Sequence, residues 1–224
     1  MYDLSGKHPW VFRRDDVDLL EDQLEDLYER YQGDTRGERS MEQEVLQEQV
    51  QTEEVSDQEL SITLGEQLFE SVHKHQEHTV PSGGEMDFEQ EDEPLIPTQQ
   101  RDPLYLEARA WSVPVFAFAQ QRYLQKDTRG REVFRIYVNT NLIPIKLSTA
   151  IQEECLDDGF AHEIALKEYE LTCTYLERVL EDLVILFETG EGRPALQQMI
   201  IGGKRLLRLV RGRHALLKRQ RRFL

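Results

Sequence analysis

The residues of this sequence best suited to binding chemistry form a basic run at its C-terminal end. Residues 201–224 include nine lysines and arginines and no acidic residue. At about 100° per residue, the leucines gather on one side of a helix and most cations on the other, Arg213 and Arg221 excepted. Such a helix suits a nucleic-acid backbone, an anionic membrane surface or an acidic protein. The candidate anion- or partner-binding residues are Lys204, Arg205, Arg208, Arg211, Lys218, Arg219 and Arg222.

The same cations have an alternative role inside the protein. The segment 160–188 carries seven acidic residues and two basic ones. If this segment packs antiparallel to the basic run, Glu181 lies opposite about Lys204 and Glu170 opposite about Arg211. The sequence leaves open whether the basic run pairs across this hairpin, binds an external anion or binds the acidic first half of the chain.

Metal chemistry finds little support in the sequence. His73, His75 and His78 lie near Glu77, but a helix would present these groups as two pairs and not as four ligands on one face. His162 lacks the preceding glutamate of the Glu-x-x-His motif that builds di-metal centres in helical bundles. We interpret it as a residue of the first turn of a helix and predict no metal site.

No catalytic motif is visible either. Cys155 and Cys173 lack the CxxC spacing of zinc or redox sites, so we interpret them as free thiols that pack like small apolar side chains. Nucleophile elbows, phosphate-binding glycine loops and HExxH are missing from the sequence. We therefore predict no catalytic residue and no cofactor, although an active site scattered along the chain stays an alternative.

The first part of the chain is strongly acidic. Residues 1–103 hold 28 acidic and 8 basic residues, within a chain whose net charge is −16. So polar a composition predicts a largely disordered arm over 1–102, with short helical islands near 15–31 and 56–75. Each island is a candidate for docking in a partner's groove or on the chain's own second half. The candidate partner-binding face of the first island consists of Val17, Leu20, Leu24, Leu27 and Tyr31.

Residues 103–224 predict a four-helix, up-and-down bundle. Asp102-Pro103 is a typical helix start, and Gly190 follows a long helix where a C-terminal glycine is favoured. A short loop before Pro194 makes the last two helices antiparallel. The core seam of the third helix is a heptad-like, coiled-coil type pattern. Its members are Leu166, Tyr169, Cys173, Leu176, Leu180, Leu183 and Phe187.

Two segments of this half remain ambiguous. Residues 132–151 fit a helix kinked at Pro144 or a strand of a β-hairpin, and we favour the helix because its neighbours are helical. Gly202-Gly203 fits a hinge or a close crossing of two helices.

Together these patterns predict an all-α protein with a non-catalytic interaction role, as an adapter or regulator of another protein. The alternative is a binder of nucleic acid or anionic membranes through the basic helix, masked by the acidic arm. No stretch approaches the roughly eighteen apolar residues of a membrane span, and residues 1–14 lack the apolar core of a signal peptide. We therefore expect a cytoplasmic location.

Overall fold

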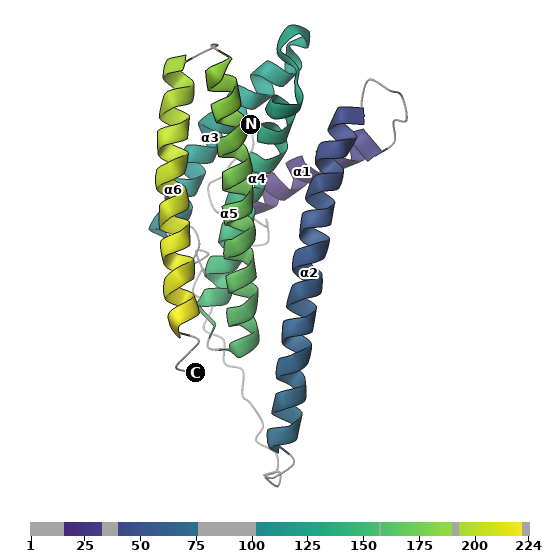
Figure 1. Cartoon of the computed structure of the whole chain (residues 1–224), viewed down its shortest axis with the longest axis vertical. Helices are drawn as coiled ribbons and strands as arrows, with labels where there is room; N and C mark the ends of the chain where they lie inside the picture. Colours follow the sequence, from purple (N-terminus) through teal and green to yellow (C-terminus); the bar gives the residue numbers. More distant parts are fainter. Residues whose placement is uncertain (1–15, 33–39, 76–101, 157, 190–192, 221–224) are drawn as a thin grey trace, which may run out of the picture.

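The chain folds into helices throughout the part that the structure describes. The computed structural model describes residues 16–32, 40–75, 102–156, 158–189 and 193–220. These residues form six α-helices and a 3-10 turn (Lys126–Thr128), and they contain no strand, which confirms the all-α prediction. The helices are α1 (Asp16–Gln32), α2 (Ser40–His75), α3 (Pro103–Leu124), α4 (Arg131–Glu154), α5 (Gly159–Glu188) and α6 (Arg193–Gln220) (Figure 1).

Helices α3 to α6 pack against their neighbours in chain order, and α6 returns to contact α3. The start of α3 lies where the sequence predicts it. The Asp102 side chain accepts hydrogen bonds from the backbone N–H groups of Leu104 at 2.8 Å and Tyr105 at 3.4 Å. The seam of α5 also lies in the core. Leu166, Tyr169, Leu176, Leu180 and Leu183 are buried, whereas Cys173 and Phe187 are half-buried.

Helix α4 is the central element, because it contacts α1, α2, α3 and α5. The ambiguous residues 132–151 are helical, with Pro144 inside the helix, as favoured from the sequence. Every residue from 138 to 145 is buried. A helix that is covered on all sides needs apolar side chains in every direction, so its apolar residues follow no single period. This explains why the segment also resembles a strand.

The N-terminal half holds more helix than the sequence predicts. Helix α1 matches the island near 15–31, but α2 begins at Ser40 instead of near residue 56 and covers 36 residues. Both helices pack against α4, and α2 also packs against α5. The islands near 15–31 and 56–75 are helical as predicted, whereas the expectation of disorder is wrong for residues 40–55, which are also helical. Composition led to this error, because Val45 and Leu46 are the only buried apolar residues among the described side chains of α2, and many of its contacts are polar.

The apolar face of α1 is docked on the second half of the chain. Leu20, Leu27 and Tyr31 are buried, and Val17 and Leu24 pack against the core. This is one of the two alternatives that the sequence left open for the first island, and it makes the face a structural one. The face is therefore not free for a partner while α1 is docked.

An aromatic cluster fixes the point where α1 and α2 meet the core. The Tyr31 and Tyr123 hydroxyl oxygens lie 2.6 Å apart, and the Tyr123 hydroxyl donates to Glu42 Oε1 at 3.1 Å. The Tyr31 ring meets Phe134 edge-on at 5.2 Å. We call these four residues the tyrosine anchor. It ties the end of α1, the start of α2, the end of α3 and the start of α4 together.

Gly202 and Gly203 mark a close helix crossing, which decides between the two interpretations of this pair. The Trp111 ring of α3 lies against both glycines, and its indole N–H donates to the Met199 carbonyl at 2.8 Å. A Cβ atom on Gly203 would lie 2.7 Å from the Trp111 ring and 2.8 Å from Leu180 Cδ2. Only glycine lets α6 approach α3 and α5 this closely.

Candidate functional site

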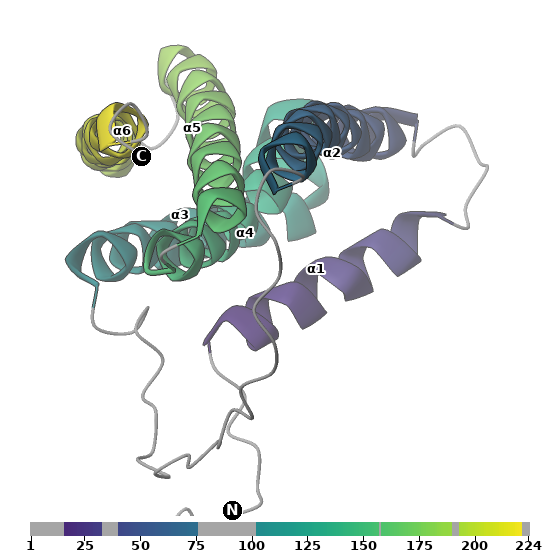
Figure 2. The ribbon, with the colours of Figure 1, turned by 90° about the horizontal axis from the view of Figure 1, so that it is seen from below.

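The basic run forms the second half of α6, at the edge of the molecule. Seen along the helices, α6 and α2 lie on opposite sides of α5 (Figure 2). The arm helices α1 and α2 pack on α4 and α5. The exposed face of α6 is therefore not covered by these two acidic helices.

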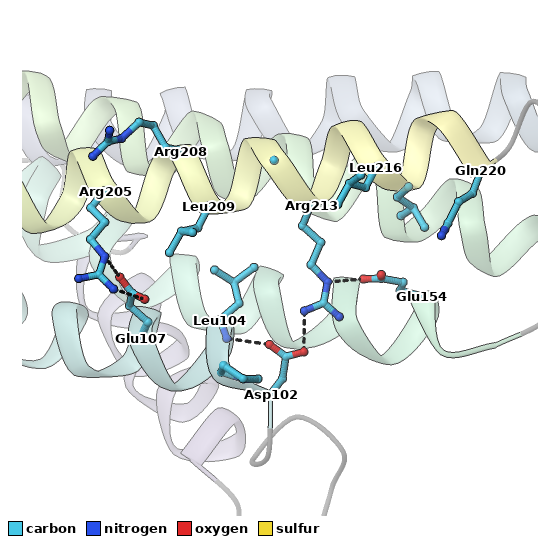
Figure 3. Close-up of a pocket in the computed structure, with 13 residues that line it drawn as sticks. Asp102, Leu104, Glu107, Glu154, Arg205, Arg208, Leu209, Arg213, Leu216 and Gln220 are labelled. Atoms are coloured by element: carbon cyan, nitrogen blue, oxygen red, sulfur yellow. Dashed lines mark hydrogen bonds and ion pairs between the residues drawn. The ribbon is translucent and has the colours of Figure 1, made fainter.

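Two of the predicted binding cations, and Arg213 beside them, have partners inside the protein. Arg205 pairs with Glu107 of α3 at 3.0 Å, and Arg211 pairs with Glu177 of α5. Arg213, an outlier on the helical wheel, points inward. Its guanidinium contacts Asp102 at 2.5 Å and Glu154 at 2.8 Å (Figure 3). Arg213 lies off the cationic side of the helical wheel because its side chain forms ion pairs inside the protein.

The pairing between α5 and α6 differs from the predicted register. Glu170 lies opposite His214, at 3.5 Å, and not opposite Arg211. Lys204 makes no ion pair with Glu181 or with any other described residue. The start of α6 at Arg193 agrees with the prediction, so the difference lies in which side chains meet across the two helices. The contact to His214 lowers the pKa of the Glu170 carboxyl to about 2, as does Lys167.

Lys204, Arg208, Lys218 and Arg219 of α6 are free of ionic partners among the described residues. They are exposed, and Arg208 makes only a hydrogen bond to the Lys204 carbonyl, at 3.4 Å. Arg222 lies outside the described residues. The face that we call the α6 cationic face consists of Lys204, Arg208, Lys218 and Arg219.

Exposed apolar side chains border this face. Ile201 is 61% exposed, Leu209 42% and Leu216 61%. Leu209 and Leu216 line a groove of about 680 Å³ between α6, the start of α3 and the end of α4. In Figure 3, Leu209 extends into this groove toward Leu104, whereas Arg208 points away from it. The site thus combines an apolar groove with unpaired cations on the neighbouring face of the same helix, of which Arg208 also lines the groove.

Carboxylates also line the groove, but each has a cationic partner. Asp102 and Glu154 contact Arg213, and Glu107 contacts Arg205. Because these acids line the groove, a phosphate that entered it would meet carboxylates. An apolar side chain flanked by acids on its own helix would fit the groove better.

The residues considered for metal or thiol chemistry do not come together in the described part of the chain. No group of three or more His, Cys, Asp or Glu residues is placed to hold a metal ion there. The side chains of His73, His75 and His78 lie outside the described set. His162 is buried, with Nε2 3.2 Å from the Leu217 carbonyl. Burial raises the pKa of the Cys173 thiol to about 11, which suits a packed thiol and not a nucleophile.

A second polar site, which sequence reasoning missed, lies between α2 and the pair α4–α5. Glu48 contacts both Arg135 and Arg178 at 3.3 Å, and Glu53 contacts Lys146 at 2.7 Å. We call the cations under α2 the basic strip: Arg131, Arg135, Lys146, Lys167 and Arg178. The spacing of Arg131 and Arg135 by four residues is a signal of this strip, but it does not identify α2 as the partner.

Two buried carboxylates of α5 lie within this site. The pKa of Glu168 is raised to about 7 by burial, against the attraction of Lys146 and with the repulsion of Glu53 and Asp57. The pKa of Asp182 is also raised to about 7 by burial, against the attraction of Arg135. Each acid therefore holds its proton more tightly in the folded protein than in the unfolded chain.

These shifts predict that the protein loses stability as the pH rises. The contribution of Glu168 is fully present below its ordinary pKa of 4.5 and is lost as the pH rises through about 7. Chemical unfolding at a series of pH values should show a fall of up to about 3 kcal/mol from this group. Glu168→Gln should flatten the slope between these pH values. An unchanged slope in this variant would contradict the assignment.

Among the described residues, no helix is long and apolar enough to cross a membrane. No family model matches the chain, and neither a curated protein nor a solved structure matches it. The candidate function therefore rests on the geometry of the α6 cationic face and of the groove beside it.

Proposed function

We propose that the protein is a non-catalytic interaction protein that binds an acidic, amphipathic helix of a partner protein along α6. The scaffold in this proposal is a four-helix, up-and-down bundle of α3–α6, to which α1 and α2 add an acidic flank. The ring of contacts from α3 through α6 and back to α3 supports this description.

One observation carries the proposal. Four cations without ionic partners lie beside exposed leucines that open into a groove of about 680 Å³. Unpaired like charges on one helix face repel one another, and exposed apolar side chains gain free energy when they leave water. Binding of an acidic helix with an apolar stripe would both neutralise the repelling charges and remove the apolar side chains from water. Its leucines would enter the groove while its carboxylates meet Lys204, Arg208, Lys218 and Arg219.

The chain itself shows the same kind of recognition elsewhere. Helix α2 is acidic, and it docks on α4 and α5 through Glu48, Glu53 and Glu59. A nucleic-acid or anionic-membrane ligand for α6 is the alternative. It is less well supported, because paired carboxylates line the groove and no described aromatic side chain lines it for base stacking. Masking of α6 by the acidic arm has no support from α1 and α2, which pack elsewhere.

A designed peptide tests the proposal directly. Its helix carries leucines at every third and fourth position with flanking glutamates, and a control peptide has the same composition in scrambled order. Fluorescence anisotropy should show binding of the first peptide only. Reversing Lys204, Arg208, Lys218 and Arg219 to glutamate should weaken this binding by at least about tenfold, since each exposed pair contributes up to about 1 kcal/mol.

The apolar part of the site has a matched control. Leu209→Ser with Leu216→Ser should weaken peptide binding, whereas Leu19→Ser with Leu124→Ser should not, although Leu19 and Leu124 are also exposed. Duplex DNA and vesicles with anionic headgroups serve as competing probes. If they bind and the peptide does not, the alternative replaces the proposal. If neither class binds, the α6 cationic face is only a solvated surface.

A further inference from the structure

We infer that the acidic part of α2 is a releasable cover over a second binding surface, the basic strip of α4 and α5, and that the uncovered strip accepts an acidic helix from another molecule. This inference concerns the side of the protein away from α6 (Figure 2). It does not depend on the function proposed for the α6 cationic face.

The contacts that keep α2 docked differ between its start and the rest of the helix. Near its start, Val45 and Leu46 are buried, and Glu42 belongs to the tyrosine anchor. Between Leu46 and Gly65, Val50 is 43% exposed, Val55 54% and Ile62 63%, and Leu60 and Leu64 are half-buried. This part of α2 therefore has no fully buried apolar side chain, and hydrophobic burial contributes less to its docking than it does at Val45 and Leu46.

Ionic and hydrogen-bonding contacts hold this part of α2 instead. Glu53 contacts Lys146 at 2.7 Å and also accepts a hydrogen bond from the Tyr175 hydroxyl. Glu59 contacts Lys167 at 2.7 Å, and Thr52 Oγ1 accepts from Arg178 at 2.7 Å. Such contacts weaken as salt screens the charges, whereas salt does not weaken the packing of the tyrosine anchor. The helix from Glu48 onward can thus lift off while its start stays in place.

The strip that α2 covers is built to remain ordered without it. Its cations project from α4 and α5, which pack closely against each other. Once α2 leaves, Glu168 and Asp182 can lie in water and ionise, next to Lys146 at 3.7 Å and Arg135 at 3.5 Å. Four carboxylates of α5 pair with the five cations of the strip, namely Glu168, Glu170, Glu181 and Asp182, so the uncovered surface keeps one excess positive charge. The chemistry of the present occupant, an acidic helix, defines the kind of partner that fits.

A pair of charge-reversed variants of the full chain tests the inference. Glu48→Lys with Glu53→Lys removes the ion pairs of α2 with Arg131, Arg135, Lys146 and Arg178 and leaves only that of Glu59 with Lys167. Glu44→Lys with Glu54→Lys makes the same change of charge at exposed positions of the same helix that have no partner in the structure. The probe is a labelled synthetic peptide with the sequence of residues 40–65. We expect it to bind the first variant at least about tenfold more tightly than it binds the control variant or the original protein.

Binding of the probe must also depend on the strip. Adding Lys146→Glu and Arg178→Glu to the releasing variant should abolish binding, and raising the salt from about 50 to about 500 mM should weaken it. Equal affinity of all variants for the peptide would overturn the inference. A single-stranded DNA probe that binds the releasing variant in place of the peptide would overturn the choice of an acidic helix.

Hydrogen exchange on the unaltered protein gives an independent measurement that needs no variant. The amides of residues 48–59 should exchange several-fold faster at about 500 mM than at about 50 mM salt, whereas those of 105–123 in α3 should not change. Protection of 48–59 that is insensitive to salt would mean that α2 is a permanent part of the fold.

Discussion

Replacing Gly203 by alanine is expected to lower the free energy of unfolding by about 2 kcal/mol, although alanine is the better helix former. The added methyl group would lie 2.7 Å from the Trp111 ring and 2.8 Å from Leu180. The leucine can rotate, but the indole ring is flat, rigid and tied to the Met199 carbonyl by a hydrogen bond of 2.8 Å. The crossing of α3 and α6 must therefore widen. Urea denaturation measures the loss.

Gly212 provides the matched control for this change. It lies on the same helix, but a methyl group there meets nothing within 4 Å. Gly212→Ala should therefore raise the free energy of unfolding by up to about 1 kcal/mol through helix propensity alone. Opposite signs for the two alanine variants support a close crossing at Gly203. If Gly203→Ala also stabilises the protein, the helices are not in contact there.

Arg213→Met is expected to lower the free energy of unfolding by about 2 kcal/mol, whereas Arg208→Met should change it by less than about 0.5 kcal/mol. The Arg213 guanidinium lies between two carboxylates, and its side chain is only 27% exposed. Methionine keeps much of the apolar stem but leaves Asp102 and Glu154 close together without their cation. Thermal and urea unfolding of both variants give the comparison.

The substitutions of Arg208 and Arg213 should also differ in their effect on peptide binding. Arg208 belongs to the α6 cationic face and Arg213 does not. Only Arg208→Met should therefore weaken binding of the designed acidic peptide. The opposite result, with Arg208 important for stability and Arg213 for binding, would contradict the division of the basic run into structural and exposed cations. The net charge of residues 201–224 alone does not distinguish structural cations from exposed ones.

Features with local causes could be predicted from the sequence. The cap at Asp102 depends on neighbouring residues, and the seam from Leu166 to Leu183 depends on a repeat within one helix. The inward position of Arg213 is visible as a misfit on the helical wheel. Each of these signals lies within a few turns of the residue that it describes, so a single sequence is enough to find it.

Features that depend on distant partners could not be predicted. Tyr175 and Glu53 are 122 residues apart in the chain, and Arg178 and Thr52 are 126 apart. Nothing in α2 alone distinguishes the glutamates that meet cations from those that face water. A segment with few apolar residues therefore suggests disorder, although paired charges hold it on α4 and α5. The register between α5 and α6 failed for the related reason that correct helix ends do not determine which side chains meet across two helices.

The tyrosine anchor has a consequence for the order in which the protein is made. Tyr31 and Tyr123 are 92 residues apart, and a ribosome adds roughly 5–20 residues each second. Helices α1 and α2 therefore leave the exit tunnel several seconds before α4 and α5 exist to receive them. During this interval their many negative charges keep the nascent segment apart from other acidic chains, and α1 and α2 reach their places only after helices that are made later.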